Sequence, residues 1–444
     1  MRKKISLHIL AEIDNNKRKQ LYSRAEDDLS EFTDQASSII STVQKDGDKA
    51  LTKYTEKFDK VSLRTDELRV TDEEFDEAFS QIDDSMNRVL KFCYSNIRRF
   101  HEMQMPKLIW FNELHPGVFA GEKTTPIDSV ACYVPRGKGS FPSVALMTTI
   151  PAVVAGVKSP IIISPPGPNG KIDPATLVVA RTVGIKQVFK CGGVQAVAAV
   201  AFGTKTIPKC QKIVGPGSPW VVAAKNILSG VIDSGPPAGP TEAIVFADET
   251  ANSQLAALDL IIESEHGPDS SVYLVTSSKQ IARDAIKLIP TFWDKMGDGR
   301  AEFSQKVLTG QRGGVVLTND TTESIKFINE YAPEHLQILS KNPHRYLDLI
   351  TNAGEILLGE HTPSSIGNFA LGPNAVLPTN GAAKTHSPLS VHDYLKTTSI
   401  GHVTENGYDL VAPFVKKFAE YEGFDGHANA VSELRKEAFF AQQK

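Results

Sequence analysis

The sequence predicts an α/β fold with two doubly wound, Rossmann-like parallel-sheet domains, a helical N-terminal segment and a C-terminal dimerisation tail. Two observations predict the sheets. From about residue 128, apolar stretches of four to six residues alternate with helical segments. These stretches are apolar throughout, which is typical of strands in a parallel sheet that is covered on both faces. Their alternation with helices indicates repeated β-α-β units.

Charged helices precede the sheets. Residues 1–28 are expected to form a helical segment, and the helical pattern continues to about residue 105. Thr71 and Glu74 form a capping box, in which a Thr is followed by a Glu three residues later. Apolar residues then recur at helical spacing to about Met105, and Pro106 ends the helix.

Two series of strands and helices follow. The first series has expected strands at 130–134, 160–164, 187–193 and 212–217. The second has them at 242–248, 271–278, 314–318, 335–340 and 355–359. Helices are expected at 142–157, 173–184, 194–203, from about Trp220, and at 251–265, 278–288, 321–331 and 343–352. The Gly- and Pro-rich segment 234–240 is the expected boundary between the series, and a tail with short helices follows about residue 385.

Composition narrows the class of protein. The chain has 444 residues, 41% of them hydrophobic and 23% charged, which is ordinary for a globular protein with a large core. A net charge of −4 predicts neither a nucleic acid nor a membrane surface as partner. Four cysteines without CxxC pairing predict buried, reduced thiols. With no signal peptide and no long apolar run, we expect a cytoplasmic protein.

Glycines mark three strand-to-helix turns, but the strict GxGxxG fingerprint is absent. The segment Gly137-Lys138-Gly139-Ser140-Phe141-Pro142 breaks it at the last position. Gly192-Gly193 and Gly215-Pro216-Gly217-Ser218 lie where strands end and helices begin. Helix N-termini there can hold phosphate oxygens, although glycines at such turns are also simply turn residues.

Two short segments combine carboxylates with histidine. Glu263 and His266 are i and i+3, so they share one face of a helix that ends at Gly267. Two ligands do not make a metal site, and a solvated helix end is the alternative. Glu334 and His335 stand at a helix-to-strand junction, where the imidazole could act as a base and the carboxylate could polarise water. Helix-end charges are the alternative there.

Two later segments extend the candidate site. The Gly-, Pro- and Asn-rich stretch 359–381 is a long irregular segment, and ordered loops of that length are usually functional. Near the C-terminus, Glu422 and His427 fall within one short segment, although a lone tail histidine is normally a surface residue.

Taken in order, six segments resemble the histidinol dehydrogenase family over about residues 30–435. They are PAGPTE at 237–242, SEHGPDS at 264–270, YAPEHLQ at 331–337, the TP…GN…GPN.VLPT loop at 362–379, SPLSVHDYLK at 387–396 and EGFDGHANAV at 422–431. The resemblance implies a homodimeric zinc (Zn2+) enzyme. It also implies oxidation of a primary alcohol, through an enzyme-held aldehyde, to a carboxylate with two NAD.

The resemblance also assigns residues. His335 would act as the base, and Glu334 would activate water. The family's Gln, His, Asp and His zinc ligands fall on Glu263, His266, Asn368 and His427, with the last supplied by the tail of the other subunit. Cofactor contacts fall on Tyr133, Gln195 and Ser218. Substrate contacts fall on Ser143, Thr241, Ser364, Ala375 and Glu422, together with Glu263, His266, His335, Asn368 and His427.

Four domain segments follow from the resemblance and the strand pattern. Residues 1–28 form the N-terminal segment, and 29–130 join 240–385 in a catalytic and metal-binding α/β domain. Residues 131–239 form the NAD-binding domain, and 386–444 form an intersubunit tail that is swapped between the two subunits.

Several positions depart from the family pattern. Glu263 replaces Gln and Asn368 replaces Asp, so one carboxylate and one amide are exchanged in place; we expect the metal site to survive. Ser364 replaces Glu and Ala375 replaces His without compensation. Ser218 replaces the family's Asn and is followed by Pro219-Trp220, and these changes could alter how the protein binds the cofactor.

These departures predict a changed substrate. The turn Pro135-Arg136-Gly137-Lys138 adds an arginine, which suits an oxyanion unless it is only a solvated loop charge. We therefore expect a neutral or anionic primary alcohol, such as a sulfonated propanediol, rather than histidinol. A true L-histidinol dehydrogenase of histidine biosynthesis and a catalytically silent dimeric ligand-binding relative are the alternatives. The joint presence of Glu334, His335, His266 and His427 argues against the silent relative.

Overall fold

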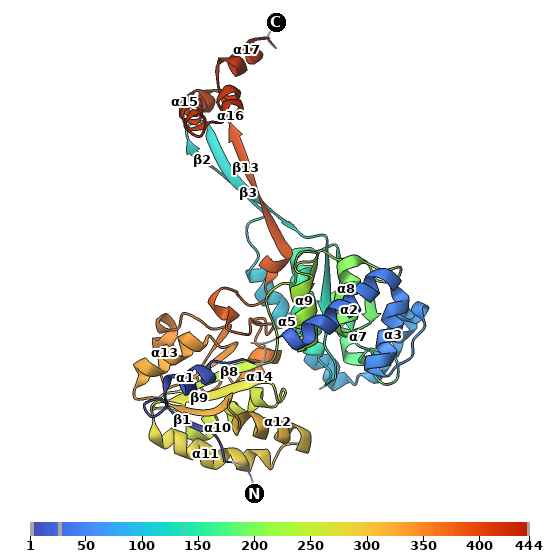
Figure 1. Ribbon diagram of the computed structural model, residues 1–444, viewed down its shortest axis with the longest axis vertical. Coiled ribbons are helices and arrows are strands. Elements are labelled where there is room, and N and C mark those ends of the chain that lie inside the picture. The colour runs from blue at the N-terminus through green and yellow to red at the C-terminus, as the bar shows by residue number, and fades with distance from the viewer. Residues whose placement is uncertain (1–3, 25–28, 138, 442–444) are drawn as a thin grey trace. The chain divides into compact units, whose positions relative to one another are not determined.

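The computed structural model describes residues 4–24, 29–137 and 139–441. The chain divides into two compact units (Figure 1). The first comprises Met1–Met105 and Ile127–Tyr394, and the second comprises Pro106–Pro126 and Leu395–Lys444. No described helix combines the length and apolar content that crossing a bilayer requires.

A six-stranded parallel sheet forms one half of the first unit. Its order is β1-β10-β9-β8-β11-β12, so the chain runs outward from β8 to one side and then returns to place β11 and β12 on the other. This is the doubly wound arrangement expected from the sequence. The strands are β1 (Leu7–Ile9), β8 (Glu242–Ala247), β9 (Ser271–Thr276), β10 (Gly313–Leu317), β11 (His335–Leu339) and β12 (Glu355–Leu358).

Helices cover both faces of this sheet. Leu260, Ile289 and Leu308 belong to a buried cluster on one face, and Phe327 and Tyr346 belong to a cluster on the other. Each such fully buried side chain stabilises the fold by roughly 1.5–3 kcal/mol. The first face is covered by α10 (Ser253–Ser264), α11 (Lys279–Trp293) and α12 (Asp298–Leu308), and the second by α1 (Asn15–Leu21), α13 (Thr321–Tyr331) and the 3₁₀ helix η2 (Pro343–Leu349).

A four-stranded parallel sheet forms the other half, in the order β6-β5-β4-β7. Here too the chain moves outward from β4 and then returns to the other side of β4. The strands are β4 (Ser129–Tyr133), β5 (Ser159–Ser164), β6 (Val188–Lys190) and β7 (Lys212–Val214). One buried cluster joins this sheet to α2 (Ser30–Asp46), α3 (Asp48–Asp59), α8 (Gly193–Phe202) and α9 (Pro219–Ile227).

The remaining helices of this half are α4 (Asp72–Gln81), α5 (Asp84–Met103), α6 (Pro142–Ala155) and α7 (Pro174–Val183), with α4 packed on α7 and α5 packed on α6. All nine strands expected from the two series are therefore present, and both sheets are parallel as predicted. The shorter elements of the unit are η1 (Thr65–Glu67), α14 (Ser364–Phe369), η3 (Ala382–Lys384) and η4 (Val391–Tyr394).

The predicted domain boundaries join 29–130 to 240–385. Helices α2 and α3 instead pack on the four-stranded sheet, whose strands lie outside those ranges except at their start. Their apolar faces, such as Ile40 of α2 and Leu51 of α3, lie in the core of the four-stranded sheet. Helical periodicity shows that a face is buried but not which sheet buries it. The described part of 1–28 also differs from an all-helical segment, because β1 adds a strand to the edge of the six-stranded sheet.

The capping box at Thr71 forms as predicted, with Thr71 and Glu74 each capping the other's backbone. The helix that follows is shorter than expected. It ends at Gln81, and Asp83 caps a new helix by accepting a hydrogen bond from the Met86 amide. The apolar spacing continues across this break, so spacing alone could not locate it.

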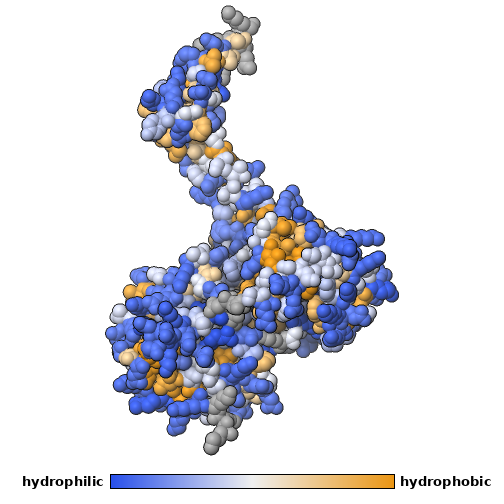
Figure 2. Space-filling view, in the orientation of Figure 1, coloured by the Kyte–Doolittle hydropathy of each residue, from blue (hydrophilic) through white to orange (hydrophobic). Residues whose placement is uncertain are grey.

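The second unit is an antiparallel three-stranded sheet followed by helices. The sheet has the order β13-β3-β2, formed by β2 (Ile109–His115), β3 (Val118–Pro126) and β13 (Leu395–Val403). The helices are α15 (Glu405–Tyr421), α16 (Asp425–Ala430) and α17 (Glu433–Ala441). Many of its large apolar side chains are exposed, and they colour parts of its surface orange in Figure 2. Leu410, Phe414, Phe418 and Tyr421 of α15 form an exposed stripe at helical spacing.

Candidate active site

The candidate site lies at the amino-terminal edge of the six-stranded sheet. His335 is the first residue of β11, and its strand register aligns it with Glu355, the first residue of β12, and with Ala243 of β8. Glu334 precedes β11 and accepts a hydrogen bond of 2.9 Å from the backbone amide of Glu242. Sheets of this type commonly bind ligands at the carboxyl edge, so this cluster occupies the opposite rim.

Helix α10 carries two further side chains to the same rim. The helix follows β8, runs back across the sheet and ends at Ser264, so its last turn lies near the starts of the strands. Oε2 of Glu263 lies 2.9 Å from Nδ1 of His266 and 4.0 Å from Nε2 of His335. The Thr241 hydroxyl lies 3.2 Å from the same Nδ1 of His266.

The short helix α14 completes the cluster within the first unit. The amide Nδ2 of Asn368 donates a hydrogen bond of 2.9 Å to Oε1 of Glu263. Ser364 begins the same helix, one turn before Asn368, and is buried. Residues i and i+4 of a helix share a face, so Ser364 lies on the side of α14 that carries Asn368.

Burial and charge act against each other in this cluster. Burial raises the pKa of Glu263, but the imidazoles of His335 and His266 outweigh burial and hold that pKa below its usual range. Burial lowers the pKa of His335, but the three carboxylates around the ring reverse the effect and raise it. Burial raises the pKa of Glu334 to about 8, although the adjacent His335 acts in the opposite direction. Burial and the charges of neighbouring groups therefore set the pKa values of this cluster together.

The side chains of this cluster can be compared with the ligands that a metal ion requires. The described residues contain no group of three His, Cys, Asp or Glu side chains arranged to hold a metal. Glu263 and His266 supply two such side chains, and Asn368 adds an amide, which is a different type of donor. Oε2 of Glu263 is buried without a hydrogen bond of good geometry, so it has capacity for a cation. Imidazole, carboxylate and amide donors are chemically suited to zinc.

Two predicted site residues lie in the second unit. His427 is an exposed residue of α16, and Glu422 is the exposed residue that ends α15. The structure brings Glu263, His266 and Asn368 together within the first unit. A role for the two tail residues at this cluster stays a prediction.

The three predicted cofactor residues share the carboxyl edge of the four-stranded sheet. Tyr133 ends β4, Gln195 is in the first turn of α8, and Ser218 is the residue before α9. The Gly193 amide donates a hydrogen bond of 3.1 Å to the Tyr133 hydroxyl. Oε1 of Gln195 is buried without a hydrogen-bond partner in the structure. The strands β4 and β7 flank the point where the winding reverses, which is where such sheets bind dinucleotides.

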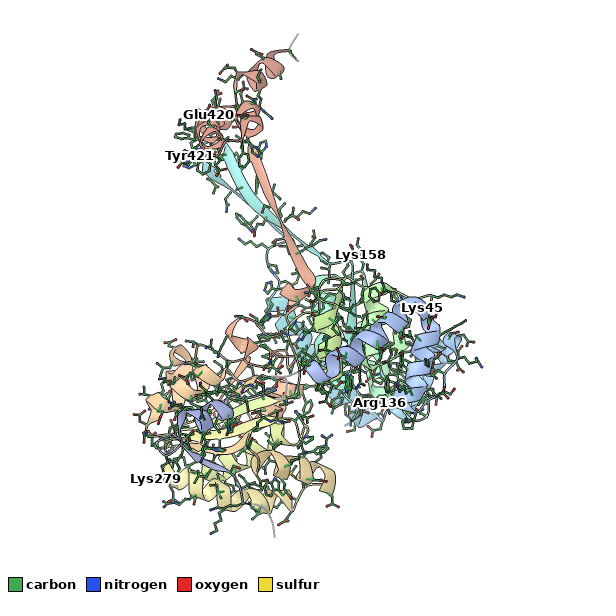
Figure 3. All side chains as sticks on the ribbon, in the orientation of Figure 1. Lys45, Arg136, Lys158, Lys279, Glu420 and Tyr421 are labelled. Carbon is green, nitrogen blue, oxygen red and sulfur yellow. The ribbon has the colours of Figure 1, made fainter. Side chains whose placement is uncertain are left out.

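Arg136 contacts a loop of this same half. Its guanidinium packs against Gly167, where an added Cβ would clash, and Nη1 donates a hydrogen bond of 3.3 Å to the carbonyl of Lys171. Figure 3 labels the Arg136 side chain on this half of the unit. These described contacts do not join Arg136 to the Glu263 cluster. Lys138 of the same predicted turn lies outside the described residues. Ser143 is a partly buried residue of α6, and Ala375 is partly buried in the segment after α14.

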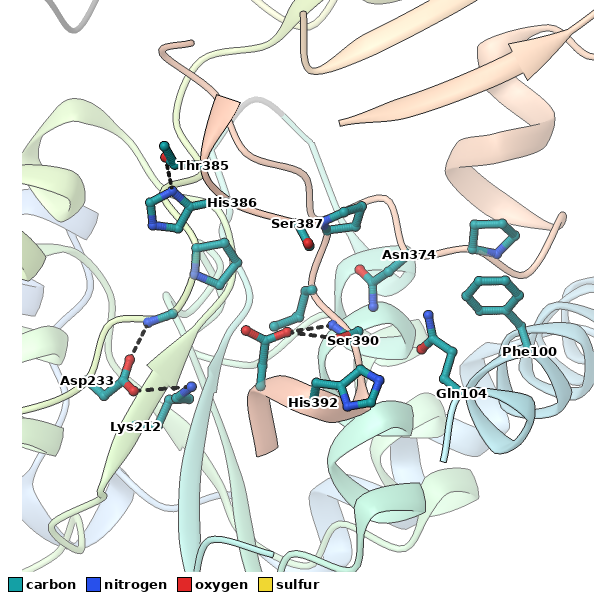
Figure 4. A pocket seen from close by; sticks show the side chains of 16 residues that line it. Phe100, Gln104, Lys212, Asp233, Asn374, Thr385, His386, Ser387, Ser390 and His392 are labelled. Carbon is teal, nitrogen blue, oxygen red and sulfur yellow. Dashed lines mark hydrogen bonds and ion pairs between the residues drawn. The ribbon is translucent and has the colours of Figure 1, made fainter. Parts of the chain in front are cut away.

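A separate cavity of about 640 Å³ opens near the end of α5 (Figure 4). Phe100, Lys212, Asn374 and His392 contribute to its wall, and none of the predicted catalytic or metal residues does. An ion pair of 3.2 Å joins Lys212 to Asp233 there. The cavity therefore does not coincide with the candidate site.

Sequence reasoning missed Glu355. Its carboxylate Oε1 lies 2.5 Å from Nδ1 of His335, closer than any other side chain in the described contacts of that ring. The sequence shows only a Glu at the start of an apolar strand. Its neighbour across the sheet depends on strand order and register, which the sequence does not state.

Comparison with known proteins places the chain in a family. The histidinol dehydrogenase family model matches residues 22–435. The chain is 56% identical to a histidinol dehydrogenase homolog of Colwellia psychrerythraea over all of both chains. It is 46% identical to a histidinol dehydrogenase of Synechocystis sp., over 93% of this chain and 95% of the relative.

The fold agrees with these sequence relationships. The crystal structure of histidinol dehydrogenase from Elizabethkingia anophelis superposes with a TM-score of 0.92 at 33% identity and covers 99% of each chain. That family consists of NAD-dependent oxidoreductases. From the matched residues, the extent of coverage and the shared fold, we conclude that this chain belongs to the histidinol dehydrogenase family.

Proposed function

We propose that the protein oxidises a primary alcohol to a carboxylate, with two NAD consumed for each alcohol. The observation that carries this proposal is the buried cluster of Glu334, His335 and Glu263 at one rim. His335 would accept the proton of the alcohol hydroxyl, and Glu334 would take a proton from the water that adds to the aldehyde. When bound, zinc would polarise the substrate oxygen and NAD would accept the hydride. The balanced reaction joins one alcohol, one water and two NAD⁺ to give one carboxylate, two NADH and three protons.

Glu263, His266 and Asn368 are proposed to hold the zinc, with His427 of the partner subunit as the fourth ligand. The exposed apolar stripe on α15 supports a homodimer, because isolated soluble chains rarely expose such a surface. The partner subunit's Glu422 would then contact the substrate. Tyr133, Gln195 and Ser218 are proposed to contact NAD. Because all four cysteines are free buried thiols, we also propose a cytoplasmic location.

The proposed substrate is a neutral or anionic diol, such as a sulfonated propanediol. The observation behind this choice is Ser364, which is buried one turn before Asn368 in the same helix. The resemblance implies a Glu at that position in the family, and its carboxylate would pair with the ammonium of histidinol. Losing a hydrogen bond to a charged group costs about 1.5–3 kcal/mol, or roughly a ten- to hundred-fold loss of affinity.

Arg136 is proposed to bind the anionic end of a sulfonated substrate. The resemblance and its charge favour an oxyanion, whereas its described contacts tie it to the 167–171 loop. A role in the site requires its side chain to leave that loop when substrate binds. The loss of the family's His at Ala375 removes a hydrogen-bonding arm, which argues against histidinol without requiring Arg136.

Names of relatives support a divergent substrate. Four relatives that are 52–56% identical to this chain are named histidinol dehydrogenase homologs. Relatives named simply histidinol dehydrogenase are 39–46% identical. Histidinol oxidation is the second candidate, favoured by the fold and by the family that the chain shares with them.

A pattern-restoring variant tests the substrate proposal. Ser364→Glu combined with Ala375→His returns the two uncompensated positions to the family pattern. The zinc-loaded wild type should reduce NAD with 2,3-dihydroxypropane-1-sulfonate or 1,2-propanediol, and the double variant should lose that activity and gain histidinol turnover by at least about tenfold. Arg136→Gln serves as the separate test of the oxyanion role, with the neutral diol as its internal control. A wild type that prefers histidinol over both diols would refute the proposal.

A further inference from the structure

We propose that Glu355 is a positioning residue for His335. In this role it fixes which ring nitrogen of His335 carries the proton. The inference rests on the proposed function only in taking His335 as the base.

Strand register sets this pair side by side. In the parallel ladder His335 of β11 aligns with Glu355 of β12, so both side chains leave the same face of the sheet. Oε1 of Glu355 lies 2.5 Å from Nδ1 of His335. Both side chains are more than nine-tenths buried, so water does not compete for the contact.

Helix α14 holds the carboxylate from its other side. A Cβ at Gly367 would lie 3.1 Å from Oε2 and 3.4 Å from Oε1 of Glu355. Glycine therefore lets the helix backbone approach the carboxylate directly. Glu355 is enclosed between the His335 ring and the turn of α14 that precedes Asn368.

The contact decides the chemistry of the ring. A carboxylate only accepts hydrogen bonds, so Nδ1 of His335 must carry a hydrogen and donate it. In the neutral ring Nε2 is then the nitrogen with a free lone pair. It faces Oε1 of Glu334 at 3.6 Å and Oε2 of Glu263 at 4.0 Å, which is the side of the proposed substrate. When Nε2 takes the alcohol proton, Glu355 stabilises the imidazolium that forms.

Glu355→Gln tests this role with little change in shape. We expect kcat to fall by about 100-fold, while the KM values for alcohol and NAD stay within about threefold and zinc content is unchanged. The downfield imidazole N–H proton signal in the NMR spectrum should disappear. Glu360→Gln is the matched control. Glu360 lies beyond the far end of β12, where its carboxylate accepts a hydrogen bond from the backbone amide of Asn252, so this variant should leave kcat unchanged.

Gly367→Ala provides a second variant in which every carboxylate is kept. Its added methyl group should displace Glu355 and lower kcat in the same direction, with the NMR signal shifted or lost. A Glu355→Gln protein with kcat within about threefold of wild type and the signal intact would overturn the proposal. If the wild type oxidises no alcohol, the proposed function fails instead, and the NMR signal of the resting protein still tests the Glu355–His335 contact.

Discussion

Nδ2 of Asn368 donates a hydrogen bond of 2.9 Å to Oε1 of Glu263, which joins two of the residues proposed to hold zinc. The resemblance implies an amide at 263 and a carboxylate at 368 in other members of the family. In this chain the carboxylate lies on α10 and the amide on α14, and the two groups are in contact. An exchange of the two residue types would therefore keep one negative charge and one amide in the proposed metal site.

The exchange predicts a charge-swap experiment at the metal site. Glu263→Gln alone leaves two neutral groups, so zinc affinity should fall by about tenfold or more. Adding Asn368→Asp restores one carboxylate and should recover most of the affinity. Zinc per protomer after chelator competition measures this outcome. Equal zinc content in the wild type, the single variant and the double variant would show that the ion binds elsewhere.

The raised pKa of Glu334 predicts that activity increases with pH. The carboxyl must be ionised to take a proton from water, and burial raises its pKa to about 8. The ionised fraction, and with it the rate of the aldehyde-to-carboxylate step, should increase about tenfold from pH 7 to pH 9. Stopped-flow absorbance with added aldehyde follows this step. Glu334→Gln should keep the first NADH and lose the second; two NADH from that variant would remove Glu334 from the water step.

The buried carboxyl of Asp259 leads to a prediction about the stability of the fold rather than about catalysis. This α10 carboxyl is 5% exposed and accepts a hydrogen bond of 2.6 Å from Gln337. Burial raises its pKa to about 6, although the Gln337 contact acts in the opposite direction. The folded state thus binds this proton more tightly than the unfolded state, so its contribution to stability falls as pH rises from about 4 to about 6.

Asp259→Asn should therefore raise the free energy of unfolding by about 1–3 kcal/mol at pH 7.5, and by less than about 1 kcal/mol at pH 4. Urea unfolding at the two pH values measures the difference. Glu302→Gln, at an exposed position of α12, is the control and should show no such trend. An Asp259→Asn protein less stable than wild type at pH 7.5 would mean that the ionised carboxylate stabilises the fold.

The proposed swapped tail predicts that two inactive variants rescue each other. Glu334→Gln and His427→Ala should each be inactive as homodimers in full alcohol oxidation. In a mixed dimer, one site would combine the intact Glu334 of one chain with the intact His427 of the other. Random exchange of subunits should then restore about a quarter of the wild-type activity. No recovery after verified exchange would show that His427 serves its own chain or none.

Much of the fold could be predicted because the sheet strands are continuous apolar blocks such as those at 242–248 and 271–278. Strands without this pattern were missed. Every residue of β2 is exposed in this chain, so its sequence carries no burial signal. Helix α12 was also missed, since only Ala301, Ser304 and two apolar residues at its end are buried.

The candidate site was less predictable than the fold. Carboxylates next to histidines identified four candidate residues from the sequence, namely Glu263, His266, Glu334 and His335. Only the family resemblance added Asn368 to them. Glu355 gave no such signal, because its relevance comes from strand register. Which sheet α2 and α3 cover was also hidden, since an amphipathic pattern does not name its partner.

The most direct test is the amount of NADH formed per alcohol consumed by the zinc-loaded wild-type protein. With 2,3-dihydroxypropane-1-sulfonate or 1,2-propanediol, we predict two NADH per alcohol, with the carboxylate as product and much slower turnover of histidinol. Two NADH per histidinol, together with no NADH from either diol, would contradict the proposed substrate class.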